Sequence, residues 1–184
     1  MQITREDQYN NIALQIFVDK ISKDFYNSME SLCNNARQQI YKLGNLEIQR
    51  TTSQYTAICD KIITDVMTCI KDWRENYTPY LQSLSEKSES NHDCSACSGN
   101  CKLNHDLKLL ELRTAHAGIR NILNRLQMVS LPLYSETMYP DSYRILRNQM
   151  ALIENNLTEL FSLEEKYMLP KVIQAQKHIN AGSY

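Results

Sequence analysis

The chain has little glycine and little proline, only four of each among 184 residues. Sheets and irregular folds need turn-forming residues at short intervals, so this scarcity predicts a few long helices. The sequence also lacks an apolar run near the roughly 18 residues that a transmembrane helix needs, and it shows no apolar segment typical of a signal peptide. We therefore expect a cytoplasmic helical protein without a membrane partner.

An excess of charge is also absent, because 20 basic and 21 acidic residues leave a formal net charge of -1. Nothing in this balance favours nucleic acid as a partner. The sequence contains no Gly-rich phosphate loop, no Gly-x-Ser-x-Gly and no His-Glu-x-x-His motif. These absences favour a binding protein over an enzyme, and no catalytic residue is assigned.

Apolar residues recur at steps of three and four along four segments, which is the pattern of helices that turn one face to a core. The segments run from about Arg5 to Leu43, from Thr52 to Leu84, from Lys102 to Met128, and from Asp141 or Ser142 onward. Pro79 and Pro170 are expected to kink the second and fourth helices, and Pro132 is expected to prevent the third from continuing.

The length fits one domain, residues 1–184, with a core of ordinary size. Four amphipathic helices predict an all-α, antiparallel four-helix bundle with up-down-up-down order. Its parts are a hairpin at 5–84, a Cys-rich loop at 85–101 between helices 2 and 3, and a hairpin at 102–180. An extended coiled coil is the less favoured alternative, because the apolar steps drift near 3.6 residues instead of holding a strict heptad.

The two hairpins form a weak internal repeat, since Pro79 and Pro170 lie 91 residues apart. At this offset three pairs of stripe positions coincide: Phe25 with His116, Cys69 with Leu160, and Trp73 with Glu164.

The fourth helix resembles the metal-binding helices of the hemerythrin-like (HHE cation-binding) family. Those helices carry a His, a Glu four residues later, and then a short run that ends in Pro. Here Glu164 and Pro170 keep the spacing, while Leu160 replaces the His. The segment AHAGIRNIL is similar to the family's third helix and matches at His116. The resemblance implies a hemerythrin-like bundle with a di-iron core, used for oxygen binding, iron sensing or repair of iron centres.

An ordinary di-iron site is not expected, because other residues stand at most of the ligand positions that the resemblance implies: Phe25, Cys69, Trp73 and Leu160. Two interpretations of the remaining polar residues are open. In the first, Glu164 pairs with Arg120, and His116 is hydrogen-bonded nearby. In the second, Cys69, His116 and Glu164 form a residual core site for one zinc or iron ion.

The run Cys94-x2-Cys97-x3-Cys101-x3-His105 supplies four metal-binding donors within twelve residues, and His92 is a substitute ligand. Because cytoplasmic thiols stay reduced, clustered cysteines indicate metal or redox chemistry before disulfides. A helix that begins near residue 102 would bring Cys101 and His105 toward one ion. The loop is therefore a predicted site for zinc or iron.

Other interpretations of the loop remain open: an iron–sulfur cluster with an outside ligand, a reversible disulfide with a third reactive thiol, or no chemistry at all. Cys33 and Cys59 are expected to be small buried hydrophobes. The sequence thus favours a metal-binding or redox-responsive bundle whose chemistry lies in the loop. The alternative is a non-catalytic interaction bundle with a decayed metal site, which binds a protein partner or a second copy of itself.

Overall fold

The computed structural model describes residues 9–43, 50–90, 100–135 and 141–181. Within these ranges all regular structure is helical, and no strand is present. No helix of the described ranges is both long enough and apolar enough to cross a membrane.

The helical segments form four rods. The first joins α2 (Leu14–Ile21), a π-helical turn η1 (Ser22–Tyr26) and α3 (Asn27–Leu43). The second joins α4 (Arg50–Asp72), η2 (Trp73–Tyr77) and α5 (Thr78–Glu89). The third is the single helix α6 (Asn100–Ser135), and the fourth joins α7 (Asp141–Leu163), η4 (Glu164–Met168) and α8 (Leu169–Ala181).

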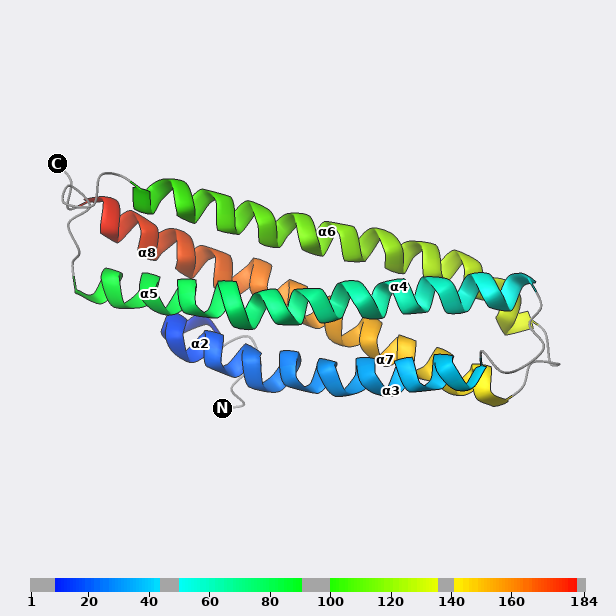
Figure 1. Ribbon diagram of the computed structural model, residues 1–184. Helices are drawn as coiled ribbons and strands as arrows, with labels where there is room; N and C mark the ends of the chain where they lie inside the picture. The colour runs from blue at the N-terminus through cyan, green and yellow to red at the C-terminus, as the bar shows by residue number, and fades with distance from the viewer. Residues whose placement is uncertain (1–8, 44–49, 91–99, 136–140, 182–184) are drawn as a thin grey trace.

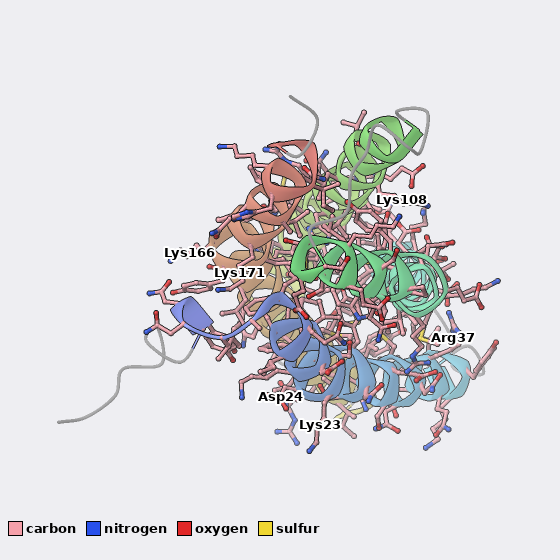
Figure 2. All side chains as sticks on the ribbon, turned by 90° about the vertical axis from the view of Figure 1, so that its left-hand side faces the viewer. Lys23, Asp24, Arg37, Lys108, Lys166 and Lys171 are labelled. Atoms are coloured by element: carbon pink, nitrogen blue, oxygen red, sulfur yellow. The ribbon has the colours of Figure 1, made fainter. Side chains whose placement is uncertain are left out.

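The rods lie side by side as a four-helix bundle, and Figure 1 shows consecutive rods pointing in opposite directions. Helix α3 packs on α4 and α7, α4 packs on α6, and α5 packs on α2 and α8. Figure 2 shows labelled charged side chains such as Lys23, Asp24 and Arg37 on the outside of the bundle. The predicted all-helical, four-helix architecture is confirmed at this level.

The apolar stripes supply the core, as predicted. Residues from all four rods are buried, among them Val18, Ile21, Ile62, Val66, Ile119, Leu146 and Ile153. Burying one such side chain contributes about 1.5–3 kcal/mol. The fold therefore depends mainly on the match between the spacing of these residues and the pitch of the helix.

Two predicted helix ends were wrong. Helix α6 continues through Pro132 to Ser135 instead of ending near Met128. Pro132 removes the one bond that its own amide would make to the carbonyl four residues back, and the three residues after it still complete a helical turn. Helix α5 extends to Glu89, so the predicted loop at 85–101 is helical at 85–89 and again from residue 100. Residues 91–99 lie outside the described ranges.

The second and fourth rods are not simply kinked at Pro79 and Pro170. A π-helical turn ends two residues before each proline, with the amide of Thr78 bonded to the carbonyl of Trp73 and the amide of Leu169 bonded to that of Glu164. Each bond spans five residues instead of four. Because proline has no N–H for the carbonyl four residues back, a wider turn just before it relieves the mismatch.

The first rod has a π-helical turn without a proline. The amide of Asn27 bonds to the carbonyl of Ser22, again five residues back. Ser28 occupies the position that corresponds to Pro79, and its hydroxyl donates to the carbonyls of Asp24 and Phe25 at 3.0 and 2.9 Å. The Ser28 hydroxyl thus bonds back to carbonyls three and four residues before it, a common arrangement for serine in a helix.

Candidate functional site

A buried acid and a buried base face each other in the bundle core. Nε2 of His116 lies 3.1 Å from Oε2 of Glu164, and the two side chains are 3% and 1% exposed. Despite this distance, neither atom has a hydrogen-bond partner of good geometry. A close pair of polar atoms with unsatisfied hydrogen bonds is costly in a core, so this pair is the first candidate for a functional site.

The other oxygen of Glu164 is satisfied by the first rod. The hydroxyl of Tyr26 donates to Oε1 at 2.8 Å. The Tyr26 ring stacks on Trp73 with centroids 4.4 Å apart and planes 10° apart, and the indole N–H donates to the Ser22 hydroxyl at 2.8 Å. The site thus couples a carboxyl group, a phenol and an indole.

Three of these side chains belong to the three π-helical turns. Tyr26 ends η1, Trp73 begins η2 and Glu164 begins η4. A π-helical turn inserts one residue into the helix and redirects the side chains around it, which is why such turns are frequent at functional sites. Their contacts place all three turns at one level of the bundle. The fourth member, His116, comes from the regular helix α6.

Burial keeps both members of the central pair neutral. It raises the pKa of Glu164 to about 8, an effect that the Tyr26 hydroxyl partly offsets. Burial also lowers the pKa of His116 to about 3, and the nearby positive charge of Arg120 lowers it further. Near pH 7 the site is therefore a protonated carboxyl group that faces an unprotonated imidazole, rather than an ion pair.

The predicted pair between Glu164 and Arg120 was wrong. Arg120 instead bonds to Oε1 of Glu165 at 2.7 Å, and both side chains are almost half exposed. The guanidinium also lies over the Phe161 ring, 5.1 Å from its centroid. Pairing at the surface spares Arg120 the dehydration that a core partner would require.

The second interpretation of the core needed three metal ligands. Among the residues whose positions are described, no three His, Cys, Asp or Glu side chains form a group that could hold a metal ion. Cys69, His116 and Glu164 are thus not gathered into such a group. Phe161 stacks on the imidazole of His116, with centroids 3.9 Å apart, and Tyr26 occupies one oxygen of Glu164.

The core also does not fit the di-iron centre that the resemblance implies. The positions at which further ligands were expected are filled by buried apolar groups, namely Phe25, Trp73 and Leu160. A carboxylate-bridged pair of irons needs several converging imidazoles and carboxylates. In the described part of the core, the facing pair of His116 and Glu164 is too small a donor set for it.

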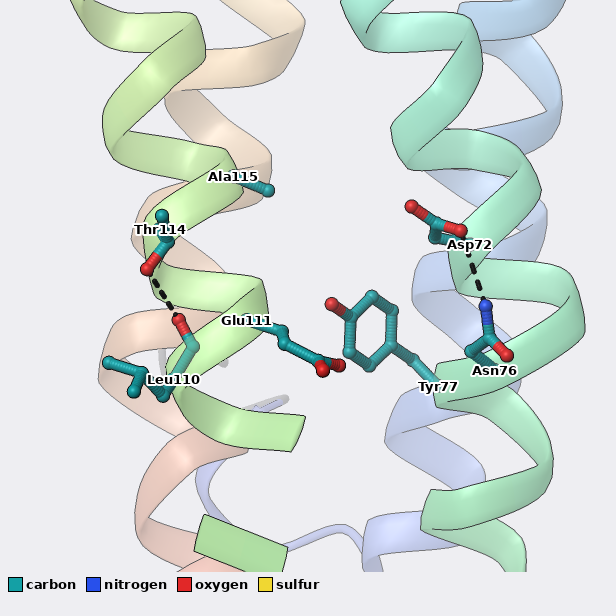
Figure 3. A pocket seen from close by; sticks show the side chains of 7 residues that line it. All are labelled: Asp72, Asn76, Tyr77, Leu110, Glu111, Thr114 and Ala115. Carbon is teal, nitrogen blue, oxygen red and sulfur yellow. Dashed lines mark hydrogen bonds between the residues drawn. The ribbon is translucent and has the colours of Figure 1, made fainter. Parts of the chain in front are cut away.

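A groove of about 540 Å³ lies between η2 and α6, lined by Asp72, Asn76, Tyr77, Leu110, Glu111, Thr114 and Ala115. Figure 3 shows the Tyr77 ring and the Glu111 carboxylate pointing toward each other across it. Burial, followed by the negative charge of Glu111, raises the pKa of Tyr77 to about 12. The Trp73 ring is the neighbour of Tyr77 on the core side, with centroids 6.5 Å apart.

The cysteines fall into two groups. Cys33, Cys59 and Cys69 are buried, and burial raises the pKa of each thiol to about 12. The prediction that Cys33 and Cys59 are buried is confirmed. In the other group, Cys94, Cys97 and the neighbouring His92 lie outside the described residues. For Cys101 and His105 only the backbone is described, and it is helical.

Sequence reasoning missed Tyr26. The apolar stripe predicted a buried position for Phe25, and the neighbouring Tyr26 is buried as well. A signal was available, because the hydroxyl of a buried tyrosine usually finds a hydrogen-bond partner, and few polar groups were expected in this core.

No family model matches the chain, and no match was found among curated proteins or among solved structures.

Proposed function

We propose that the protein is a metal-binding helical bundle whose metal site is the Cys-rich connection between α5 and α6. Its donors are Cys94, Cys97, Cys101 and His105, with His92 as the substitute. Three thiolates and one imidazole are a frequent ligand set for structural zinc, so zinc is the favoured ion and iron the second. In this proposal the bundle has the up-down-up-down order of hemerythrin-like proteins without their core iron chemistry.

The observation that carries the proposal is the start of α6 at Asn100. With residues 100–107 helical, Cys101 and His105 are one turn apart along the same helix. Cys101 also lies in the first turn of α6, where the unpaired backbone N–H groups of a helix favour negative charge.

The contrast between the two cysteine groups gives further support. The core thiols of Cys33, Cys59 and Cys69 hold their protons far above neutral pH because they are buried. Metal binding and thiol oxidation both require the thiolate. Any such chemistry near pH 7 is therefore expected from the cysteines of the connection.

The test is the metal content of protein purified without oxygen, measured by mass spectrometry of the wild type and of a Cys94→Ser/Cys97→Ser variant. We expect about one equivalent of zinc or iron in the wild type and less than about a tenth in the variant, because two of four ligands are lost. Added zinc should raise the melting temperature of the stripped wild type and not that of the variant.

A Cys33→Ala/Cys59→Ala variant is the matched control, since it also removes two cysteines but should keep the metal. Equal metal contents in all three proteins would refute the loop site. A wild type that binds no metal, with loop thiols that never oxidise reversibly, would favour the alternative of a non-catalytic interaction bundle.

A further inference from the structure

A row of three oxidisable rings leads from the groove to the buried acid and base. Tyr77 lines the groove, Trp73 lies behind it at 6.5 Å between centroids, and Tyr26 stacks on Trp73 at 4.4 Å. Phenols and indoles are the side chains, apart from thiols, that lose a single electron most readily. When one of these rings has lost an electron, a ring in contact with it can supply a replacement, so the oxidised position moves from ring to ring.

The innermost ring also has a route for its proton. A phenol that loses an electron becomes a strong acid, so its oxidation is easy only where a base takes the proton. The Tyr26 hydroxyl donates to Oε1 of Glu164 at 2.8 Å, and Oε2 of the same carboxyl group faces Nε2 of His116 at 3.1 Å. An acceptor of protons therefore directly adjoins the end of the row of rings.

We propose that Tyr26 is a proton-coupled redox site, oxidised by a one-electron oxidant that docks in the groove at Tyr77. The oxidant gains one electron, which leaves Tyr26 through Trp73 and Tyr77. The O–H bond of Tyr26 breaks, its proton bonds to Oε1 of Glu164, and a neutral tyrosyl radical remains. The step uses the ionised form of Glu164, which becomes the main form above its pKa of about 8, because the imidazole of His116, with a pKa of about 3, is too weak a base to take a second proton.

The surroundings suit this role at both ends of the row. Tyr26 and Trp73 are 2% and 1% exposed, so a radical on Tyr26 is shielded from solvent and from other chains. At the groove, Glu111 pairs with Lys108 at 3.3 Å, and the Lys108 ammonium lies 5.9 Å from the centroid of the Tyr77 ring. The charges around Tyr77 are therefore mixed, and it is the groove itself that gives a small oxidant access to the outer end of the row.

The test uses the whole protein and a ruthenium(III) tris(bipyridine) cation, generated by a light flash with an irreversible electron acceptor. Electron paramagnetic resonance and transient absorption then identify the radical. We expect a tyrosyl radical in the wild type and a loss of about tenfold or more in Tyr26→Phe, which keeps the stacked ring. Trp73→Phe should lower its rate of formation by a similar factor, because phenylalanine is not oxidised.

Tyr41→Phe is the control for an exposed tyrosine, since Tyr41 is 72% exposed, and it should leave the signal unchanged. Glu164→Gln keeps an oxygen acceptor but takes up no proton, so it should shorten the radical lifetime. The wild-type rate should fall in heavy water. These readouts separate a redox role from a merely structural one, and circular dichroism checks that each variant is folded.

A tyrosyl signal that keeps its wild-type amplitude and lifetime in Tyr26→Phe, or that disappears in Tyr41→Phe, would overturn the proposal. So would a rate that is the same in ordinary and heavy water. The same flash experiment on Cys94→Ser/Cys97→Ser separates this inference from the loop metal site, because it should keep the Tyr26 radical whether or not the loop binds metal.

Discussion

The second and fourth rods contain the same backbone feature with different contents. In each, a π-helical turn ends two residues before a proline, and the two turns are 91 residues apart. Trp73 begins one turn and Glu164 begins the other. In these two rods a proline accommodates the widened turn, whereas the chemistry follows from the residue that begins the turn.

The two residues have opposite energetic roles. Trp73 brings a large apolar surface, stacks on Tyr26 and has its N–H satisfied by Ser22, so its burial stabilises the fold. Glu164 is equally buried, but it must hold its proton to be tolerated, and one of its oxygens has no well-formed hydrogen bond. One turn serves mainly stability, while the other retains a costly polar group, which is typical of functional sites.

The largest loss of stability is therefore expected when Trp73 is replaced. Replacement by Ala in the fully buried position should lower the free energy of unfolding by about 3–5 kcal/mol. Glu164→Ala should cost far less, about 1–3 kcal/mol, because the loss of partners for Tyr26 and His116 is offset by removal of a buried carboxyl group. Urea unfolding of both variants measures the difference. Equal losses would mean that the two turns have the same role.

The pH dependence of the free energy of unfolding should reveal the raised pKa of Glu164. The Glu164 pKa rises from 4.5 to about 8 on folding, so its contribution to stability is complete below pH 4.5 and is lost as the pH rises toward 8. The His116 pKa falls from 6.5 to about 3, so its contribution is complete above pH 6.5 and is lost as the pH falls toward 3.

Between pH 4.5 and 6.5 the two effects oppose each other, and stability should be at a plateau. Above pH 6.5 only Glu164 still changes, and the loss approaches about 1.4 kcal/mol per pH unit for one proton. Urea titrations at pH 5, 6, 7 and 8 test this, with those values chosen to span the window. Glu164→Gln is the control, and its curve should be flatter above pH 6.5. Parallel curves for the two proteins would contradict the raised pKa of Glu164.

Much of the fold could be predicted from the sequence because it depends on periodicity. The spacing of residues such as Val18 and Ile62 defines which face of each helix is buried, whatever the neighbouring rods contain. The helix ends were less predictable. Helix α6 passes through Pro132 at the cost of one backbone bond, and composition alone does not reveal that a further turn follows the proline.

The candidate site was predicted only in part. His116 and Glu164 were identified from the resemblance and are indeed neighbours. Their partners were not predicted, since Arg120 pairs with Glu165 and the Tyr26 hydroxyl donates to Glu164 instead. Each π-helical turn shifts the register by one residue, so a helical wheel of regular pitch misplaces the side chains beyond it. Tyr26, at the end of η1, is among the residues that this shift affects.

Replacing either proline is expected to change the free energy of unfolding less. Pro79→Ala and Pro170→Ala each restore an amide that can bond to the carbonyl four residues back, a gain of about 1 kcal/mol. The more flexible unfolded chain of each variant offsets most of this gain, at about 0.4–1 kcal/mol. Both variants should thus unfold within about 1 kcal/mol of the wild type and agree with each other. A large change at Pro170 alone would show that η4 depends on its proline more strongly than η2 does.

The smallest effect should come from Arg120. Its bond to Glu165 lies at the surface, next to the buried Glu164, and exposed pairs of this kind contribute about 0.2–1 kcal/mol. Arg120→Ala should cost no more than that, and salt should reduce the difference. If Arg120 instead neutralised Glu164, its loss would strand a buried charge and cost about 3–5 kcal/mol. Urea unfolding at low and high salt shows which of the two acids Arg120 pairs with. The exposed Glu165 and the buried Glu164 are adjacent in the fourth rod, and a salt-sensitive, small loss of stability indicates that Arg120 pairs with Glu165 only.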